Sequence, residues 1–492
     1  MTPVPVPTVP ALGALLFGPF RPCEWGLLLL VGGILASGAV AHGIGSGARV
    51  FLALVLSALL ILHVWGEGWR WQMAPVYLAA LPALAWLGLT WLGRPAWPRP
   101  LAWAGAVFGI GAGLATAVLA IVMPIFRLPP PAGPLAVGTR LYHLVDTARA
   151  EPHLPGGQAR RELMVQVWYP AAPNTGHGVA AYRSDTNRLA LSHLRLVATA
   201  ARAEAVPAPS DQPRPVVLFA HAWRGSRNQN TALVQDLAAR GFVVAAFDRP
   251  YNAGLVAFPD GRVVTAPADM TLDLSDEKAR LATLDLGARE AIIGAADASA
   301  VLDALGRLGA GDPLAGQIAA DRAIILGHSF GGAVAAEACR RDHRFVAALN
   351  LDGWLFATAR DEGVPCRYLL MNDGEPVPPD EQLAAPQAAV RAAARMQIDD
   401  RQAQERSFAR YGGWDLTVAG ATHEDFTDRV FYSPLRRLTG AGEAAPGRIN
   451  ALVRIYASAL AAASFGDGPA TALDAPPAEF PELRFRRWPS ER

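Results

Sequence analysis

Charged side chains are scarce in the first quarter of this 492-residue chain. The whole sequence has 44 basic and 43 acidic residues, but only seven of them precede residue 127: Arg21, Glu24, Arg49, Glu67, Arg70, Arg94 and Arg99. This density is roughly a quarter of that in the remainder, and it is too low for the surface of a water-soluble domain. We therefore predict a membrane region at 1–127.

Two further shortages narrow the class of protein. The net charge is only +1, so the chain lacks the basic surface that nucleic-acid binding requires. It has three cysteines, Cys23, Cys339 and Cys366, and their spacing matches neither a disulfide framework nor a zinc site. Cys339 and Cys366 are available to pair with each other, but the sequence alone does not decide whether they do.

Four apolar stretches in the first part are long enough to span a bilayer: 25–41, 48–65, 74–92 and 101–125. Eight of the 13 tryptophans lie in this part, mostly near the ends of the stretches, which is typical of the membrane interface. The first 20 residues have no basic start and contain four prolines, so we expect no cleaved signal peptide. The prediction is a multi-pass protein of the cell membrane.

The orientation of these spans is undecided by sequence. Arg21, Arg70 and Arg127 would lie on one side and Arg49, Arg94 and Arg99 on the other, so the positive-inside rule gives a tie. Gly105, Gly109 and Gly113 recur every fourth residue and let a neighbouring helix approach closely. This stripe favours packing within the four-helix bundle, with self-association as the alternative.

A proline-rich linker at 128–136 precedes the soluble part, for which we predict a catalytic domain at 137–464 and a proline-rich tail at 465–492. Short apolar runs indicate strands, and longer patterned runs between them indicate helices. Strands separated by helices predict a mainly parallel sheet covered on both faces. The expected strands are 162–168, 215–220, 243–247, 323–326, 346–351, 368–371 and 416–418, and the expected helices are 230–240, 276–308, 332–340, 384–410 and 449–462.

The motif GHSFGG at 327–332 lies between a predicted strand and a predicted helix. A serine at such a corner sits on a tight turn above the sheet, and small residues leave room for the backbone. Ser329 is therefore the candidate nucleophile, and the fold is expected to be an α/β-hydrolase. A structural glycine-rich turn is the alternative interpretation.

A serine needs a histidine base, and in this fold the base follows the serine and the acid in the chain. Only His343 and His423 follow Ser329. His423 comes after a late strand and enters a loop, and we favour it over His343, which lies in the charged run RRDHR. Asp352 and Asp373 each end a strand after the serine, so position alone leaves the acid undecided.

These motifs resemble the platelet-activating-factor acetylhydrolase family of α/β-hydrolases. The resemblance rests on GHSFGG, on LDGW at 351–354, on the His423 loop, and on the segments at 137–149, 161–171 and 228–264. It implies that Asp352 is the acid and that Asp373 is satisfied by turn amides. It also implies an oxyanion hole formed by the amides of Trp223 and Phe330.

One departure affects that oxyanion hole. The family commonly has His-Gly before the residue that matches Trp223, whereas this chain has His221-Ala222. Alanine tolerates fewer backbone angles than glycine, so the position of the Trp223 amide depends on the conformation at Ala222. His221 itself is expected to brace the loop.

The resulting prediction is a membrane-anchored serine esterase that needs no metal ion or organic cofactor. The resemblance implies short or oxidised acyl chains of phospholipids as substrates. Polyester, xenobiotic or other small esters are the alternative, with lid or pocket segments expected at 251–308 and 376–410. A non-catalytic sensing or scaffold module on a membrane anchor is a further alternative, which would predict a missing triad member.

Overall fold

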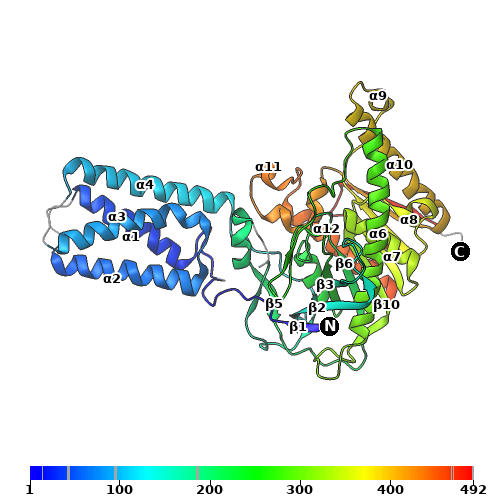
Figure 1. Ribbon diagram of the computed structural model, residues 1–492, viewed down its shortest axis with the longest axis horizontal. Coiled ribbons are helices and arrows are strands. Elements are labelled where there is room, and N and C mark those ends of the chain that lie inside the picture. The colour runs from blue at the N-terminus through cyan, green and yellow to red at the C-terminus, as the bar shows by residue number, and fades with distance from the viewer. Residues whose placement is uncertain are drawn as a thin grey trace.

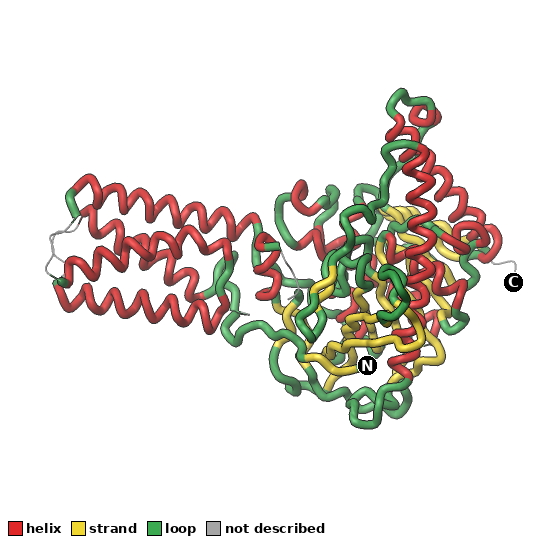
Figure 2. Tube along the Cα trace, in the orientation of Figure 1, coloured by secondary structure: helices red, strands yellow, loops and turns green. Residues whose placement is uncertain are grey.

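The computed structural model describes the chain except for residues 14, 41–44, 93–96, 184–187, 467, 469 and 490–492. A rod of four helices projects from a rounded α/β body, as Figures 1 and 2 show. Arg94, one of the arginines used in the orientation argument, lies outside the described residues.

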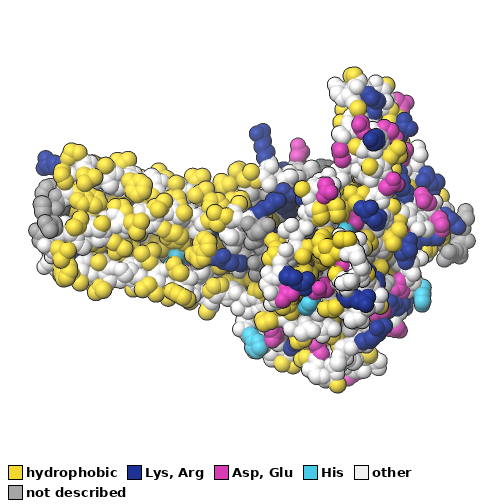
Figure 3. Space-filling model, viewed as in Figure 1, with side chains coloured by type: hydrophobic (Ala, Val, Ile, Leu, Met, Phe, Trp, Pro, Cys, Tyr) yellow, Lys and Arg dark blue, Asp and Glu magenta, His cyan; other side chains and the backbone are white. Residues whose placement is uncertain are grey.

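The rod consists of helices close to the four predicted spans. They are α1 (Pro22–Val40), α2 (Ser46–Leu62), α3 (Ala74–Trp91) and α4 (Arg99–Val122), with one π-helical turn, η1 (His63–Gly68), and one 3-10 turn, η2 (Trp71–Met73), between α2 and α3. All four helices are long and apolar enough to cross a membrane. Large apolar side chains such as Phe51, Leu81 and Leu114 are exposed on the rod, and Figure 3 shows its visible surface as almost uncharged.

The glycine stripe of α4 packs against α1 within the rod. A Cβ atom on Gly109 would lie 2.8 Å from Leu35 Cδ1, and one on Gly113 would reach Leu28. Because α1 covers this face, the structure gives no support to self-association through Gly105, Gly109 and Gly113.

Ionisable groups gather at the end of the rod that adjoins the α/β body. Arg21 and Arg70 both bind Glu24, with Nη2 of Arg21 and Nε of Arg70 at 2.8 and 2.7 Å from Oε1. All three side chains are completely buried. The network therefore ties the start of α1 to the segment before α3.

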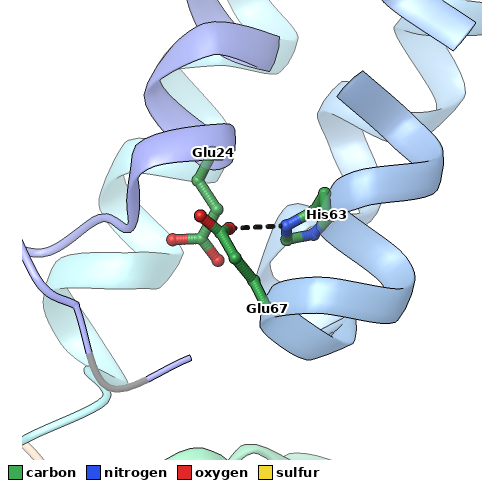
Figure 4. A group of neighbouring side chains, drawn as sticks. All are labelled: Glu24, His63 and Glu67. Atoms are coloured by element: carbon green, nitrogen blue, oxygen red, sulfur yellow. Dashed lines mark hydrogen bonds and ion pairs between the residues drawn. The ribbon is translucent and has the colours of Figure 1, made fainter. Parts of the chain in front are cut away.

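A histidine and a second carboxylate extend this network (Figure 4). Nδ1 of His63 lies 3.0 Å from Glu67, and Nε2 of His63 lies 2.5 Å from the Tyr77 hydroxyl. Ligand atoms of Glu24, His63 and Glu67 lie within 4.8 Å of one another, a spacing that could hold a metal ion. Arginines already bind Glu24 and lie beside Glu67, so we interpret the group as an ion-pair network.

A mixed sheet forms the centre of the α/β body. Its strand order is β14-β13-β12-β11-β10-β6-β7-β3-β2-β5-β4, with β1 also paired to β2, and the run from β13 to β7 is parallel. The strands are β1 (Thr2–Val4), β2 (Ala136–Ala150), β3 (Arg160–Ala171), β4 (Val179–Ala181), β5 (Ala198–Ala203), β6 (Arg214–Ala220), β7 (Val243–Asp248), β10 (Ile318–His328), β11 (Phe345–Leu351), β12 (Arg367–Asn372), β13 (Gly413–Val418) and β14 (Leu483–Trp488). A separate hairpin joins β8 (Val256–Ala257) and β9 (Val263–Val264).

Helices cover both faces of the sheet, as predicted. The α5 and α12 helices pack on one face, where Leu326 and Leu349 point, and α6, α7 and α10 pack on the other, where Ile325 and Ala348 point. Alternate side chains of each central strand therefore enter different cores. The helices are α5 (Thr231–Ala239), α6 (Glu277–Gly306), α7 (Phe330–Arg341), α8 (Ala357–Glu362), α9 (Asp380–Leu383), α10 (Ala388–Tyr411), α11 (Arg436–Thr439) and α12 (Pro446–Phe465), with 3-10 turns η3 (Leu189–Leu196), η4 (His423–Phe426), η5 (Asp428–Phe431) and η6 (Thr471–Leu473).

Both ends of the chain contribute to this sheet, which differs from the predicted boundaries. β1 precedes the rod yet pairs with β2, and β14 lies within the expected tail yet forms the antiparallel edge beside β13. Neither short strand stands out in sequence, because prolines surround both segments. The sheet thus extends beyond 137–464 in both directions.

The structure shows which cysteines pair. Cys339 in α7 and Cys366 just before β12 form a disulfide, with their Cα atoms 5.9 Å apart. Cys23 is a free, buried cysteine at the start of α1. The bond links the helix after GHSFGG to a neighbouring strand of the sheet.

Candidate active site

Ser329 occupies a sharp turn between β10 and α7. Its φ angle is +54°, a conformation that L-residues adopt at a cost, and its amide donates to the Leu351 carbonyl at 2.8 Å. A Cβ atom on Gly327 would collide with the Gly331 backbone, and one on Gly331 would collide with Ala220. The turn therefore requires both glycines and holds the serine above the end of the sheet.

His423 and Asp352 meet beside this turn. Nδ1 of His423 lies 2.6 Å from Oδ2 of Asp352, across 71 residues of sequence. Asp352 follows β11, and His423 begins the 3-10 turn η4 after β13. This hydrogen bond occupies Nδ1 and leaves Nε2 of the imidazole free to exchange a proton with another group.

Neither competing residue takes part in the hydrogen bond between His423 and Asp352. Asp373 donates its backbone N–H to Oδ1 of Asp352 at 3.0 Å, and its own carboxylate accepts the Glu375 amide. Asp373 is thus satisfied by a turn amide, as the resemblance implied. His343 is exposed beyond the C-terminal end of α7, whereas Ser329 precedes the N-terminal end of that 12-residue helix.

The two amides expected to bind an oxyanion come from adjacent segments. Phe330 is the first residue of α7, so its N–H has no acceptor within the helix. The Trp223 and Phe330 rings pack edge to face with their centroids 4.8 Å apart. Ala222 has no positive φ angle, so alanine fits where the family commonly has glycine.

His221 is buried under this loop, in agreement with a bracing role. Its Nε2 accepts the Arg249 amide at 3.2 Å, and its carbonyl accepts Nη2 of Arg249 at 2.6 Å. Burial, reinforced by the charge of Arg249, holds the pKa of His221 well below its usual range. The imidazole is therefore neutral, as its acceptor role requires.

A bridge of Gln229 and His328 connects the parts of the site, and we did not predict it from the sequence. Gln229 accepts the Ala222 amide at 3.0 Å and binds Nδ1 of His328 at 2.6 Å. Nε2 of His328 then donates to the His423 carbonyl at 2.9 Å. The position of His328 inside GHSFGG, next to the serine, was the available signal.

The carboxylates around His423 raise the pKa of its imidazole. Burial lowers the pKa of His423, but the hydrogen bond and charge of Asp352, with smaller contributions from Glu424 and Asp373, raise it above its ordinary value. Burial and the neighbouring Asp352 charge raise the pKa of Asp373 to about 6. Burial, together with the charge of His423, keeps the pKa of His328 well below its usual range.

A cavity of about 760 Å³ opens above these residues. Ser329, Asp352 and His423 all line it, and among the described residues no hydrogen bond joins Ser329 to His423. Both segments expected to hold pocket residues contribute to its wall. The residues are Leu272 and Leu274 from the first, and Pro376, Val377, Pro378, Gln397, Asp400, Arg401 and Gln404 from the second.

A strained serine turn at the end of a mainly parallel sheet, beside a late histidine, defines an α/β-hydrolase. A family model described as platelet-activating factor acetylhydrolase, isoform II, matches residues 121–258 and 301–373. The chain belongs to this family. The match leaves nearly all of the helical rod outside it.

Curated relatives share this family at low identity. A probable 1-alkyl-2-acetylglycerophosphocholine esterase of Arthroderma benhamiae is 22% identical over 270 residues, which are 51% of this chain and 65% of the relative. The platelet-activating factor acetylhydrolase of Bos taurus is 25% identical over 234 residues, 44% of this chain and 49% of the relative. The chain therefore spans between about half and two thirds of these two relatives.

A solved structure matches more of the α/β body. The ferulic acid esterase of Streptomyces cinnamoneus is 31% identical, with a TM-score of 0.58. The match covers 73% of this chain and 99% of the esterase. This similarity supports the same fold. The name of the esterase gives a different substrate from the names of the two curated relatives.

Proposed function

We propose that this chain is a membrane-anchored serine esterase that hydrolyses carboxylic esters through a Ser329–His423–Asp352 triad. The observation that carries the proposal is the 2.6 Å hydrogen bond between His423 and Asp352, next to the strained Ser329 turn. Family membership and the esterase names of the relatives support the same reaction class.

The mechanism follows from the chemistry of these groups. His423 takes the hydroxyl proton of Ser329 as the oxygen attacks the ester carbonyl, and it then gives that proton to the departing alcohol. Water, activated by the same imidazole, cleaves the acyl-enzyme. Asp352 accepts a hydrogen bond from Nδ1, which keeps Nε2 available and stabilises the imidazolium.

The amides of Phe330 and Trp223 are the proposed oxyanion hole. The Phe330 amide begins α7, where the helix dipole favours negative charge. The Gln229 hydrogen bond to Ala222 fixes the loop that carries Trp223. Loss of one such donor typically costs about 10²–10³ in rate.

The proposed substrates are phospholipids with short or oxidised acyl chains. The names of the relatives support this class, and four membrane-spanning helices would keep the enzyme close to lipid. A second candidate is an ester of an aromatic acid, which the ferulic acid esterase match and an aromatic cavity wall of Phe330, Trp354 and Phe356 favour.

Two measurements on the purified full-length protein test the reaction. A fluorophosphonate reagent should label the parent protein at Ser329, and Ser329→Ala should abolish both labelling and ester hydrolysis. Unchanged hydrolysis by Ser329→Ala would exclude this nucleophile, and absence of labelling in the parent would favour a scaffold. Comparing kcat/KM for a short-acyl phospholipid and a feruloyl ester then separates the two substrate classes.

A further inference from the structure

Residues 434–438, with the sequence PLRRL, form an exposed surface loop that includes most of the short helix α11. Leu435 and Leu438 are 49% and 53% exposed, and Arg436 and Arg437 between them are exposed as well. Neither arginine forms an ion pair with a carboxylate in the described part of the chain. Arg436 donates from Nη1 to the Gly442 carbonyl. Exposed leucines next to exposed arginines are typical of segments that lie at a lipid interface.

This 434–438 loop lies at the end of the rod that faces the α/β body. Figure 1 shows α11 beside the C-terminal end of α4. The segment just before the loop packs there directly, because the rings of Phe431 and Tyr432 stack on Phe126 with centroids 6.2 and 5.4 Å apart. Phe126 lies four residues beyond the last residue of α4.

Other exposed apolar and basic side chains surround the same end of the rod. Phe17, Trp65 and Trp69 are exposed there, and Arg195 lies over the Trp69 ring at 4.5 Å. Figure 3 shows basic side chains on the body next to the rod, where the apolar surface ends. Tryptophans with arginines mark the level of lipid headgroups.

We propose that the 434–438 loop is a second membrane contact, which places Leu435 and Leu438 at the bilayer interface and binds anionic lipid headgroups through Arg436 and Arg437. The inference rests on the proposed membrane spans, because the rod sets the position of the loop relative to lipid. The partner is the anionic bilayer surface, since two exposed guanidinium groups favour phosphate diesters with net negative charge.

The loop is held firmly at its base, next to the candidate histidine. The Thr422 hydroxyl donates to the Gly440 carbonyl at 2.6 Å, and the Gly442 amide donates to Asp425 at 2.9 Å. These bonds join η4, which begins with His423, to the residues that follow the 434–438 loop. The loop and the segment that carries the proposed base are therefore directly connected.

A polarity-sensitive fluorophore on Leu438→Cys tests the contact in the full-length protein. The labelled protein is placed in nanodiscs of phosphatidylcholine alone or mixed with phosphatidylglycerol. Leu281→Cys is the matched control, because Leu281 is 50% exposed and belongs to α6, which Figure 1 shows on the part of the α/β body away from the rod. Cys23 is buried, and Cys339 and Cys366 form a disulfide, so the native cysteines do not take the label.

The expected result is a blue shift at residue 438 that is larger with phosphatidylglycerol and absent at residue 281. Adding Arg436→Gln and Arg437→Gln should remove the phosphatidylglycerol-dependent part, and salt should reduce it. Protein that enters the discs without a shift at residue 438, or with an equal shift at residue 281, contradicts the lipid contact alone. Protein that stays outside the discs contradicts the spans and this proposal together.

Discussion

At the scale of single residues, the site depends on which of two neighbouring carboxylates meets the imidazole. Asp352 contacts His423 through its side chain, whereas Asp373 contacts Asp352 only through its backbone amide. A side-chain substitution therefore removes the contact with the imidazole at Asp352, but it leaves the backbone contact of Asp373 in place.

We expect Asp352→Asn to lower kcat/KM by about 10²–10⁴-fold, because the amide cannot hold the required imidazole tautomer or stabilise its charge. Asp373→Asn keeps the backbone N–H that orients Asp352, so it should cost less than about tenfold. Steady-state hydrolysis of a soluble acyl ester measures both. A larger loss in Asp373→Asn would assign the acid to the later strand.

The pH profile should reflect the raised pKa of His423. The base acts only when neutral, so kcat/KM should rise with pH through the pKa of the free enzyme, which lies above the ordinary histidine value. Asp373 is one of the charges that raise this pKa. Asp373→Asn should therefore move the acidic limb of the profile to lower pH, and a shift to higher pH would contradict this assignment.

At the scale of elements, the end of the rod is fixed by buried ion pairs as well as by apolar packing. Glu24 receives hydrogen bonds from both Arg21 and Arg70, and no part of these three side chains reaches solvent. Glu24 in α1 thus joins the arginine just before α1 to the arginine just before η2, and Glu67 lies 3.8 Å from Arg21 as well.

Glu24→Gln should destabilise the rod by about 3–5 kcal/mol, because it removes the carboxylate that binds both buried guanidinium groups and leaves Arg21 with the more distant Glu67. Glu381→Gln on α9 is a suitable control, since Glu381 is exposed. Thermal unfolding in detergent compares the two variants. Equal stability of both variants would show that the network contributes little.

Local sequence signals were sufficient for the main elements and for the serine. The four apolar stretches, the central strands and the strand-to-helix turn at Ser329 follow from short-range patterns, and the structure has them close to the predicted positions. The Gln229–His328 bridge and strand β14 depend on pairing between distant segments. No local pattern encodes such pairing, so these features required the fold.

At the scale of the whole molecule, two observations bear on the side of the membrane. The α/β body contains a Cys339–Cys366 disulfide, and disulfides persist mainly in oxidising compartments. At the body end of the rod, Glu24 and Glu67 balance the charges of Arg21 and Arg70. At the opposite end, Arg49 lies in the first turn of α2 and Arg99 begins α4. The connecting sequences 41–48 and 92–99 contain no carboxylate, and the second of them includes Arg94.

We therefore expect the opposite end of the rod to face the cytoplasm and the α/β body to lie on the oxidising side. A reporter active only outside the cytoplasm, fused at the C-terminus, should be active, and a cytoplasmic reporter at the same position should be silent. The reverse pattern would contradict this orientation.

The pairing of β1 with β2 has a consequence for biosynthesis. β1 leaves the ribosome before the rod, yet its partner residues Leu141–His143 follow only after all four helices of the rod. The first strand must therefore wait, unpaired, on the side where the enzyme will fold, until the intervening helices have been made. For the proposed membrane rod, insertion and folding of the α/β body would then be ordered events, with β1 pairing to β2 only after the rod has been made.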